Sequence, residues 1–358
     1  MINKSNCVDI KSNKIKSVKS ILTNLFNNEL DGDFDGICFI KKNNSDKEYL
    51  FLNHEIDDTS SKINNAKVTR ITYKNSKCIK NEYWLTNLKS LCSMFRTPWN
   101  TVLTNDEDDG YVYEFDPYDK NICLQHKKLG KMNHEKTIFA PCKKKYKYDF
   151  YTTSDNKNGG GIYKFTPDKY KNLSKGKLYG FSSLEGKSGD KIIKGEWKFI
   201  DDPENATKTE GIVQFIKIEG LTYNNYDGHI YFCVTSDLND GLGYIYKLNL
   251  ETPVAELYLD CNKLNGKLGN PDNIASDKNG NLYICEGKKD KSIPDRLIFV
   301  QLKTKKIETL LQGRDNYGEM TGVEFNNDYS TLFVNWKNGK LNNNDDDKKY
   351  SELFEVKF

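Results

Sequence analysis

Residues 272–286 read Asp-Asn-Ile-Ala-Ser-Asp-Lys-Asn-Gly-Asn-Leu-Tyr-Ile-Cys-Glu, and this stretch predicts the fold. A short apolar strand runs to Asp277, the turn Lys278-Asn279-Gly280 follows, and a second strand runs to Glu286. Asn-Gly accepts the positive φ values that a tight hairpin turn needs. A third apolar strand, over 296–302, follows after a loop. The stretch therefore predicts a unit of antiparallel strands whose hairpin begins and ends on an acid.

The same unit recurs along the chain. The second strands of six copies close at Glu55, Glu107, Asp155, Asp237, Glu286 and Asn335, so the intervals are 52, 48, 82, 49 and 49 residues. Repeats of about 50 residues with three or four strands each indicate a propeller, since one such sheet cannot bury both faces until neighbours stack on it. We therefore expect an all-β protein with a six-bladed β-propeller. Only one strand, over 351–358, follows the last hairpin, so an N-terminal strand is expected to complete the final blade.

Two segments are expected to depart from the repeat. A short amphipathic helix is predicted within residues 14–30 from apolar residues at helical spacing, namely Ile15, Val18, Ile21, Leu22 and Leu25. The long interval contains a stretch rich in Lys, Gly and Ser at about 168–210, which we expect to be a loop-rich insertion. The predicted organisation is an N-terminal extension over 1–30 and a single propeller domain over 31–358.

Charge and composition narrow the functional classes. The 358 residues carry 54 Lys and Arg against 51 Asp and Glu, and this balance gives no general basis for binding nucleic acid or an acidic membrane. Residues 1–30 lack the apolar core of a secretory signal. Nine cysteines are scattered without a CxxC pair, so we expect buried thiols in the cytoplasm or another reducing compartment.

The acids of the repeat are expected to converge. In a propeller blade the start of the first strand and the end of the second share one mouth, because neighbouring strands are antiparallel. The first-strand acids are Asp35, Glu135, Glu219, Asp272 and Glu319, and the second-strand acids are Glu55, Glu107, Asp155, Asp237 and Glu286. Gathered carboxylates repel one another unless cations bind or pKa values rise. Oxygen-only ligands favour calcium or magnesium over zinc, and flexible carboxylate-rich sites favour calcium. The alternative is that these acids merely end strands and cap turns in water.

The motifs at these positions resemble the PhoX-type alkaline phosphatases, a family of calcium-dependent propeller enzymes. The matching segments occur in the family's order and are Asn53-His54-Glu55, residues 97–104 beginning Thr97-Pro98-Trp99, His134-Glu135, the strand over 151–155 before residues 159–165, Lys217-Ile218-Glu219-Gly220, Pro271-Asp272-Asn273 and Glu319-Met320-Thr321-Gly322. The resemblance implies a metal-dependent phosphatase that hydrolyses phosphoric monoesters, with a small phosphorylated molecule as its substrate and neither nucleic acid nor membrane as a partner.

The resemblance also implies roles for individual residues. The expected metal ligands are Glu55, Asp106, Glu107, Glu135, Glu219, Asp272 and Glu319. Glu219 and Lys217 are the expected catalytic residues, with Lys217 supplying positive charge beside a phosphate oxygen. The expected substrate contacts are Lys217, His134 and Asn105. For His134 the alternative is a structural histidine at a strand end.

Two departures from the family pattern leave other functions open. Asn105 stands where the family has an iron-ligating cysteine, and its neutral oxygen is a poor ligand for ferric iron, so calcium is the expected cofactor and iron is doubtful. Lys217 replaces an arginine, which exchanges a bidentate fork for a point charge. One alternative is a catalytically reduced propeller that binds a protein partner or acts as a scaffold. The other is a calcium-dependent lactonase or esterase, which residues 271–273 and 277–283 also resemble.

Overall fold

The computed structural model describes residues 7–25, 33–42, 47–55, 66–75, 77–142, 148–156, 159–235, 241–287, 294–314, 318–340 and 349–358. These residues form β-strands with three short 3-10 helices, η2 (Lys127–Leu129), η3 (Pro203–Lys208) and η4 (Cys261–Lys263). The chain divides into two compact units: unit 1 comprises Met1–Met94 and Ala275–Phe358, and unit 2 comprises Phe95–Ile274. In the described ranges no helix has both the length and the apolar character needed to cross a lipid bilayer.

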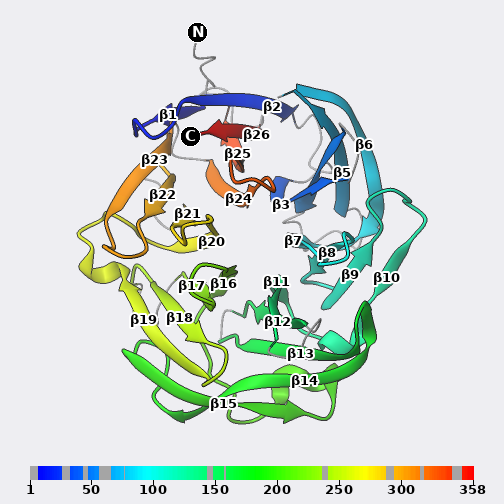
Figure 1. The fold of residues 1–358 in the computed structure, drawn as a ribbon, viewed down its shortest axis with the longest axis vertical. Coiled ribbons are helices and arrows are strands. Elements are labelled where there is room, and N and C mark those ends of the chain that lie inside the picture. The colour runs from blue at the N-terminus through cyan, green and yellow to red at the C-terminus, as the bar shows by residue number, and fades with distance from the viewer. Residues whose placement is uncertain are drawn as a thin grey trace. The chain divides into compact units, whose positions relative to one another are not determined.

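Unit 1 contains antiparallel sheets built from consecutive strands (Figure 1). One sheet runs β3 (Asp33–Lys41), β4 (Glu48–Glu55), β5 (Ala66–Lys74), β6 (Lys77–Leu88). A second contains β21 (Leu282–Glu286), β22 (Arg296–Val300), β23 (Ile307–Gly313) and the N-terminal strand β1 (Val8–Ile10). A third runs β24 (Glu319–Phe325), β25 (Thr331–Lys340), β26 (Lys349–Lys357), and β2 (Ser17–Leu25) adds its fourth strand. An N-terminal strand thus completes the last sheet, as predicted.

Unit 2 contains a nine-stranded sheet and the strands that precede it. β8 (Val102–Asp106), β9 (Tyr111–Phe115) and β10 (Cys123–Gln125) pair in chain order. The large sheet joins two meanders, the first being β11 (His134–Pro141), β12 (Tyr148–Ser154), β13 (Ile162–Lys169), β14 (Asn172–Glu185), and the second β16 (Ile218–Asn224), β17 (His229–Val234), β18 (Tyr244–Asn249), β19 (Val254–Asp260). The chain passes between the units within β7 (Leu91–Arg96) and β20 (Pro271–Ser276).

The strand β15 (Ile192–Ile200) links the two meanders of unit 2. It pairs with β14 along its length and with β19 at residues 192–194. The architecture is therefore all-β and propeller-like, as predicted, but two of the expected blades are hydrogen-bonded into one sheet.

The predicted N-terminal helix is wrong, because residues 17–25 form strand β2. The register of β2 against β26 shifts between Ser20 and Leu22, so a bulge interrupts the alternation of buried and exposed side chains. Helical spacing and bulged-strand spacing look alike over so short a segment. Pairing with β26 decides the outcome, and it makes residues 17–25 part of unit 1 instead of a separate extension.

The expected loop-rich insertion at about 168–210 is also wrong, since it contains the whole of β14 and β15. In β15 the side chains of Ile192, Lys194, Glu196 and Lys198 are exposed, whereas Ile193 is buried with Phe181 of β14 in the core of unit 2. A strand with one solvent-exposed face tolerates polar residues, and these are the residues from which a loop was predicted.

The packing of β2 gives a first prediction. Val18 is 2% exposed and lies in the core of unit 1 with Phe354 and Val356 of β26. We expect Val18→Ala to lower the free energy of unfolding by about 2 kcal/mol, because two buried methyl groups are lost and a small cavity remains. Urea unfolding measures this change. The control is Lys16→Ala, at an exposed position before the strand; equal effects of the two substitutions would contradict the packing of β2.

Candidate metal centre

Three carboxylates meet within unit 2. Glu135 on β11, Glu219 on β16 and Asp272 on β20 each place an oxygen within 4.8 Å of the others. Each acid is the second residue of its strand, and Glu135 and Glu219 are buried while Asp272 is half-buried. The repeated sequence thus places one acid at the same point of three strands, as predicted for these positions.

Irregularities in strand pairing determine the direction of the Glu135 and Glu219 side chains. On β11, Glu135 and Lys136 lie opposite the single residue Thr153 of β12, because the register shifts between His134 and Thr137. On β16, a register shift between Ile218 and Leu221 leaves Glu219 and Gly220 at an equivalent irregularity against β17. A β-bulge bends its strand and changes the direction of the extra side chain. The strand entry therefore carries each glutamate on a bulge.

Gly220 allows β16 and β20 to approach closely. A Cβ atom at this position would lie 2.7 Å from the carbonyl oxygen of Asp272 and 3.1 Å from Cα of Asn273. Backbone atoms cannot rotate away from such a contact, so the site requires glycine. The close approach brings Glu219 beside Asp272, whose Oδ1 accepts a 2.6 Å hydrogen bond from Asn273 Nδ2.

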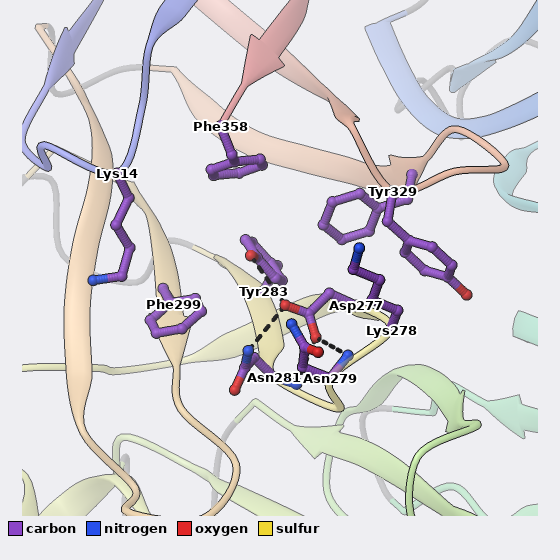
Figure 2. A pocket seen from close by; sticks show the side chains of 10 residues that line it. Lys14, Asp277, Lys278, Asn279, Asn281, Tyr283, Phe299, Tyr329 and Phe358 are labelled. Atoms are coloured by element: carbon purple, nitrogen blue, oxygen red, sulfur yellow. Dashed lines mark hydrogen bonds between the residues drawn. The ribbon is translucent and has the colours of Figure 1, made fainter.

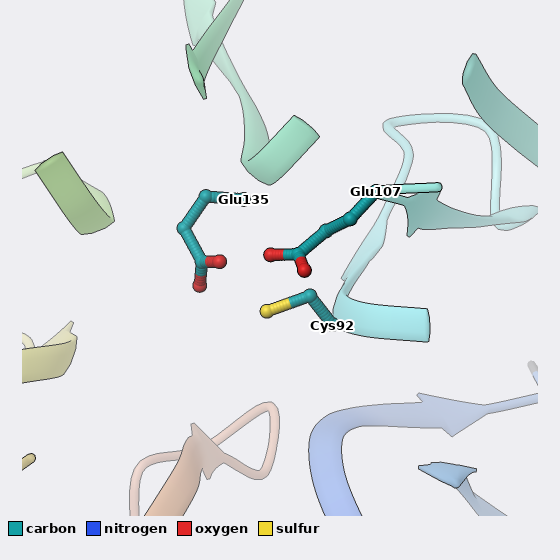
Figure 3. A group of neighbouring side chains, drawn as sticks. All are labelled: Cys92, Glu107 and Glu135. Atoms are coloured by element: carbon teal, nitrogen blue, oxygen red, sulfur yellow. The ribbon is translucent and has the colours of Figure 1, made fainter. Parts of the chain in front are cut away.

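Glu107 adds a fourth carboxylate. It follows β8, and its carboxylate comes within 4.8 Å of that of Glu135; Figure 3 shows the two side chains pointing toward each other. Cys92, also drawn there, belongs to unit 1, where its Sγ lies 3.4 Å from Asp35 Oδ2. The acid cluster of unit 2, namely Glu107, Glu135, Glu219 and Asp272, is hereafter called the acid cluster.

Burial and like charges determine the protonation of the cluster. Burial first, and then the charges of Asp272 and Asp155, raise the pKa of Glu219 well above its ordinary value. Lys217 opposes this shift, since its Nζ lies 3.3 Å from Glu219 Oε1, and the carboxylate in turn raises the pKa of the lysine. One lysine faces several acids, so an added cation would stabilise the ionised form of the cluster.

The donor atoms of the cluster suit calcium. All four side chains offer only carboxylate oxygens, which hard divalent cations prefer. Asn105 is buried within β8 and brings no thiolate to its position, so its chemistry does not suit the iron site that the resemblance implied. The residues that would hold a calcium ion are therefore Glu107, Glu135, Glu219 and Asp272.

Three other predicted ligands make contacts of their own. Glu55 and Glu319 belong to unit 1, where Glu55 forms an ion pair with Lys337 and Glu319 lies opposite Lys337 in the β24–β25 register. Asp106 is fully buried, and its Oδ1 accepts the backbone N–H of Asp109 at 2.9 Å in the turn after β8. Asp237 falls outside the described residues.

His134, a predicted substrate contact, makes its hydrogen bonds within the protein. Its Nε2 lies 3.0 Å from the carbonyl oxygen of Gly130, and its Nδ1 lies 2.9 Å from Thr152 Oγ1. Both ring nitrogens are thus engaged inside the protein. Burial lowers the pKa of His134 to about 4, so the ring is neutral near pH 7. This geometry favours the structural alternative.

Asp155 was expected among the converging second-strand acids but not among the metal ligands, and the structure makes it a neighbour of the site. It follows β12, and its charge acts on both Glu219 and Lys217. The signal was present, because Asp155 closes a second strand in the same way as Glu107. The effect of its charge on Glu219 agrees with the expectation that second-strand ends lie near first-strand acids.

Unit 1 contains a pocket of different character (Figure 2). Its volume is about 390 Å³, and its wall is largely aromatic, formed by Tyr283, Phe299, Phe325, Tyr329 and Phe358. Its one acid, Asp277, accepts the backbone N–H groups of Asn279 and Asn281 at 2.8 and 2.9 Å, so it stabilises the hairpin turn. The pocket lacks the group of acids that distinguishes the acid cluster.

The raised pKa of Glu219 predicts how stability depends on pH in the metal-free protein. Above the ordinary glutamate pKa the unfolded chain releases its proton while folded Glu219 keeps it, so the free energy of unfolding falls as pH rises. We expect Glu219→Gln to remove this loss and to stabilise the protein at pH 8 in chelator by more than the ~0.5 kcal/mol typical of surface changes. Urea unfolding at several pH values measures it. Glu185→Gln, at an exposed ion pair with Lys194, is the control, and an equal response of both variants would contradict the expectation.

Comparisons with known proteins agree with this fold. No curated protein matches the chain by sequence. Virginiamycin B lyase from Staphylococcus aureus, solved as a catalytically inactive variant with quinupristin, shares 11% identity over 96% of this chain and 100% of its own, with a TM-score of 0.51. A candidate gluconolactonase shares 9% identity over 98% of this chain and 94% of its own, with a TM-score of 0.52. At such identities the likeness shows a common fold.

The sequence identifies the family of the chain, whereas the structural likeness shows only the fold. A family model for alkaline phosphatase PhoX matches residues 103–339, which is more than half of the chain and includes every acid of the cluster. The match therefore covers the same segments from which the structure builds its group of carboxylates. The chain belongs to the alkaline phosphatase PhoX family.

Proposed function

We propose that the protein is a metal-dependent phosphoesterase that acts on small phosphorylated molecules at the acid cluster. The observation that carries this proposal is the meeting of Glu135, Glu219 and Asp272 within 4.8 Å in a chain of the PhoX family. A buried group of carboxylates costs folding free energy, and a bound cation offsets this cost and is also useful for phosphoryl chemistry.

Calcium is the proposed cofactor, held by the acid cluster. When bound, it supplies positive charge that neutralises phosphoryl oxygens and polarises the phosphate ester. The carboxylates would hold the ion from separate strands, and two of them are fixed in place by bulges within the sheet. The four acids of the cluster offer oxygen donors, which favour a hard divalent cation such as calcium.

Lys217 is the proposed phosphate contact. Its side chain is 37% exposed, whereas Glu219 beside it is buried, so the ammonium group has access to a ligand that the carboxylate lacks. Its backbone φ of +47° is uncommon for a residue with a side chain and places Lys217 at the turn just before β16. An ammonium group at this place would contact a non-bridging phosphate oxygen as a point charge.

Six blades are the proposed organisation of the propeller. Each of the meanders β11–β14 and β16–β19 has the four strands of one blade, and β15 is then an added strand between them. The final blade consists of β24, β25, β26 and β2. The proposed domain is a single propeller to which both chain ends contribute strands, and a reducing compartment is the proposed location.

Hydrolysis of p-nitrophenyl phosphate tests the proposed function. We expect activity with added calcium, loss of activity with chelator, and a decrease in kcat of more than about 100-fold for Glu219→Gln, because even residues that support a metal ligand are worth 10- to 100-fold. Glu185→Gln at the exposed Glu185–Lys194 pair should retain full activity. A folded, calcium-loaded protein that leaves phosphate esters intact would overturn the proposal; hydrolysis of lactones would then favour a lactonase, and inertness toward both would favour a binding scaffold.

The role of Lys217 has its own test. We expect Lys217→Met to raise the inhibition constant of inorganic phosphate about 10- to 100-fold, since a hydrogen bond to a charged group contributes about 1.5–3 kcal/mol. Lys217→Arg should bind phosphate at least as well as the native protein, because the guanidinium group keeps the charge and adds a second donor. Phosphate inhibition that is unchanged in Lys217→Met would place the phosphate elsewhere.

A further inference from the structure

We propose that Thr153 is a positioning residue whose hydroxyl group fixes Glu135 and Glu219 in the geometry that binds the cation. The inference rests on the metal centre of the proposed function. Thr153 is fully buried on β12, and it is the single residue that faces the bulge of β11. It therefore lies between the two strands that present the glutamates, without offering a ligand itself.

One hydroxyl group connects three strands at this point. Thr153 Oγ1 accepts the backbone N–H of Lys136 on β11 at 3.2 Å and donates to the backbone carbonyl of Glu219 on β16 at 2.8 Å. The N–H of Lys136 belongs to the peptide group that follows Glu135. The two bonds thus hold the main chain next to the Cα atoms of both glutamates, and the hydroxyl sets their relative position.

The bulge explains why a hydroxyl group is needed. The extra residue of a bulge disturbs the ladder of backbone hydrogen bonds, and a buried N–H without an acceptor is costly. A hydroxyl group can accept from one strand while donating to another, which an aliphatic side chain of the same shape cannot do. Thr152 contacts the two residues that flank the same bulge. Its Oγ1 lies within hydrogen-bonding distance of His134 Nδ1 and accepts a 3.0 Å hydrogen bond from Thr137 Oγ1.

Equivalent side chains elsewhere show that the second of these bonds, the donation to a backbone carbonyl oxygen, belongs to the fold. In unit 2, Thr235 Oγ1 donates to the carbonyl oxygen of Pro271 at 2.7 Å. In unit 1, Asn53 Nδ2 donates to the carbonyl oxygen of Ser93 at 3.1 Å. In the sequence, Thr235 and Asn53 each stand two positions before an acid, as Thr153 stands before Asp155. Thr153 adds the bond from the bulge of Glu135 and so joins two members of the acid cluster.

Calcium titration calorimetry of the full chain tests the inference. We expect Thr153→Val to weaken calcium binding about 10- to 100-fold, the range found when a partner that orients a ligand is lost. Thr153→Ser keeps the hydroxyl group and should recover most of the affinity. Ser182→Ala is the matched control, because Ser182 on β14 is also buried and donates a 2.8 Å bond to a backbone carbonyl, that of Gly211, in the same unit. This variant should lose thermal stability with no change in calcium affinity.

The outcomes separate the inference from the proposed function. If the native protein binds calcium and cleaves no phosphate ester, the proposed function fails while the affinity ratio of Thr153→Val to native still decides the inference. Calcium affinity that is unchanged in Thr153→Val overturns the inference, and so does a loss that Thr153→Ser does not recover. If the native protein binds no calcium, both fail. Should Thr153→Val not fold, Thr153→Ala, which also removes the hydroxyl group, is compared with Thr153→Ser in the same way.

Discussion

The burial of like charges is the constraint on which the site depends. Glu135, Glu219 and Asp272 bring oxygen atoms within 4.8 Å of one another, and Lys217 compensates only part of the negative charge. Such a group repels itself in a partly dehydrated environment and raises the pKa of its most buried member, Glu219. The surrounding sheet must hold the acids in place against this repulsion, which is why the site lies at strand entries instead of on free loops.

A few local structural features of the sheets provide that rigidity. Bulges at Glu135 and Glu219 direct the two side chains, Gly220 permits two backbones to touch, and Thr153 joins the strands by one hydroxyl group. Each feature is a small departure from regular strand geometry, and all of them gather at one place. Departures of this kind concentrate at functional sites, because regular pairing alone aims side chains only to the two faces of a sheet.

The family match and the chemistry of the acid cluster both support the proposed phosphoesterase function. The PhoX match includes every acid of the cluster, and the structure brings those acids together in unit 2. The two departures from the family pattern, at Asn105 and Lys217, also lie in this part of the chain. Asn105 is a buried strand residue that brings no thiolate, and Lys217 offers a single ammonium group beside Glu219. The acid cluster therefore offers oxygen donors that could hold a metal ion, and Lys217 offers a single positive charge beside them.

The sequence by itself determined the strand repeat and the positions of the acids, because hairpin turns and the alternation of apolar residues are local properties of the chain. It placed Glu135, Glu219 and Asp272 at strand entries and required an N-terminal strand to complete the last sheet. Tertiary structure decided the rest. Pairing with β26 made a bulged strand of the segment that looked helical, and pairing with β14 and β19 made β15 from a polar stretch. The roles of His134 and Thr153 depend on partners distant in sequence, such as the carbonyl oxygen of Glu219, and only the folded chain brings those partners within hydrogen-bonding distance.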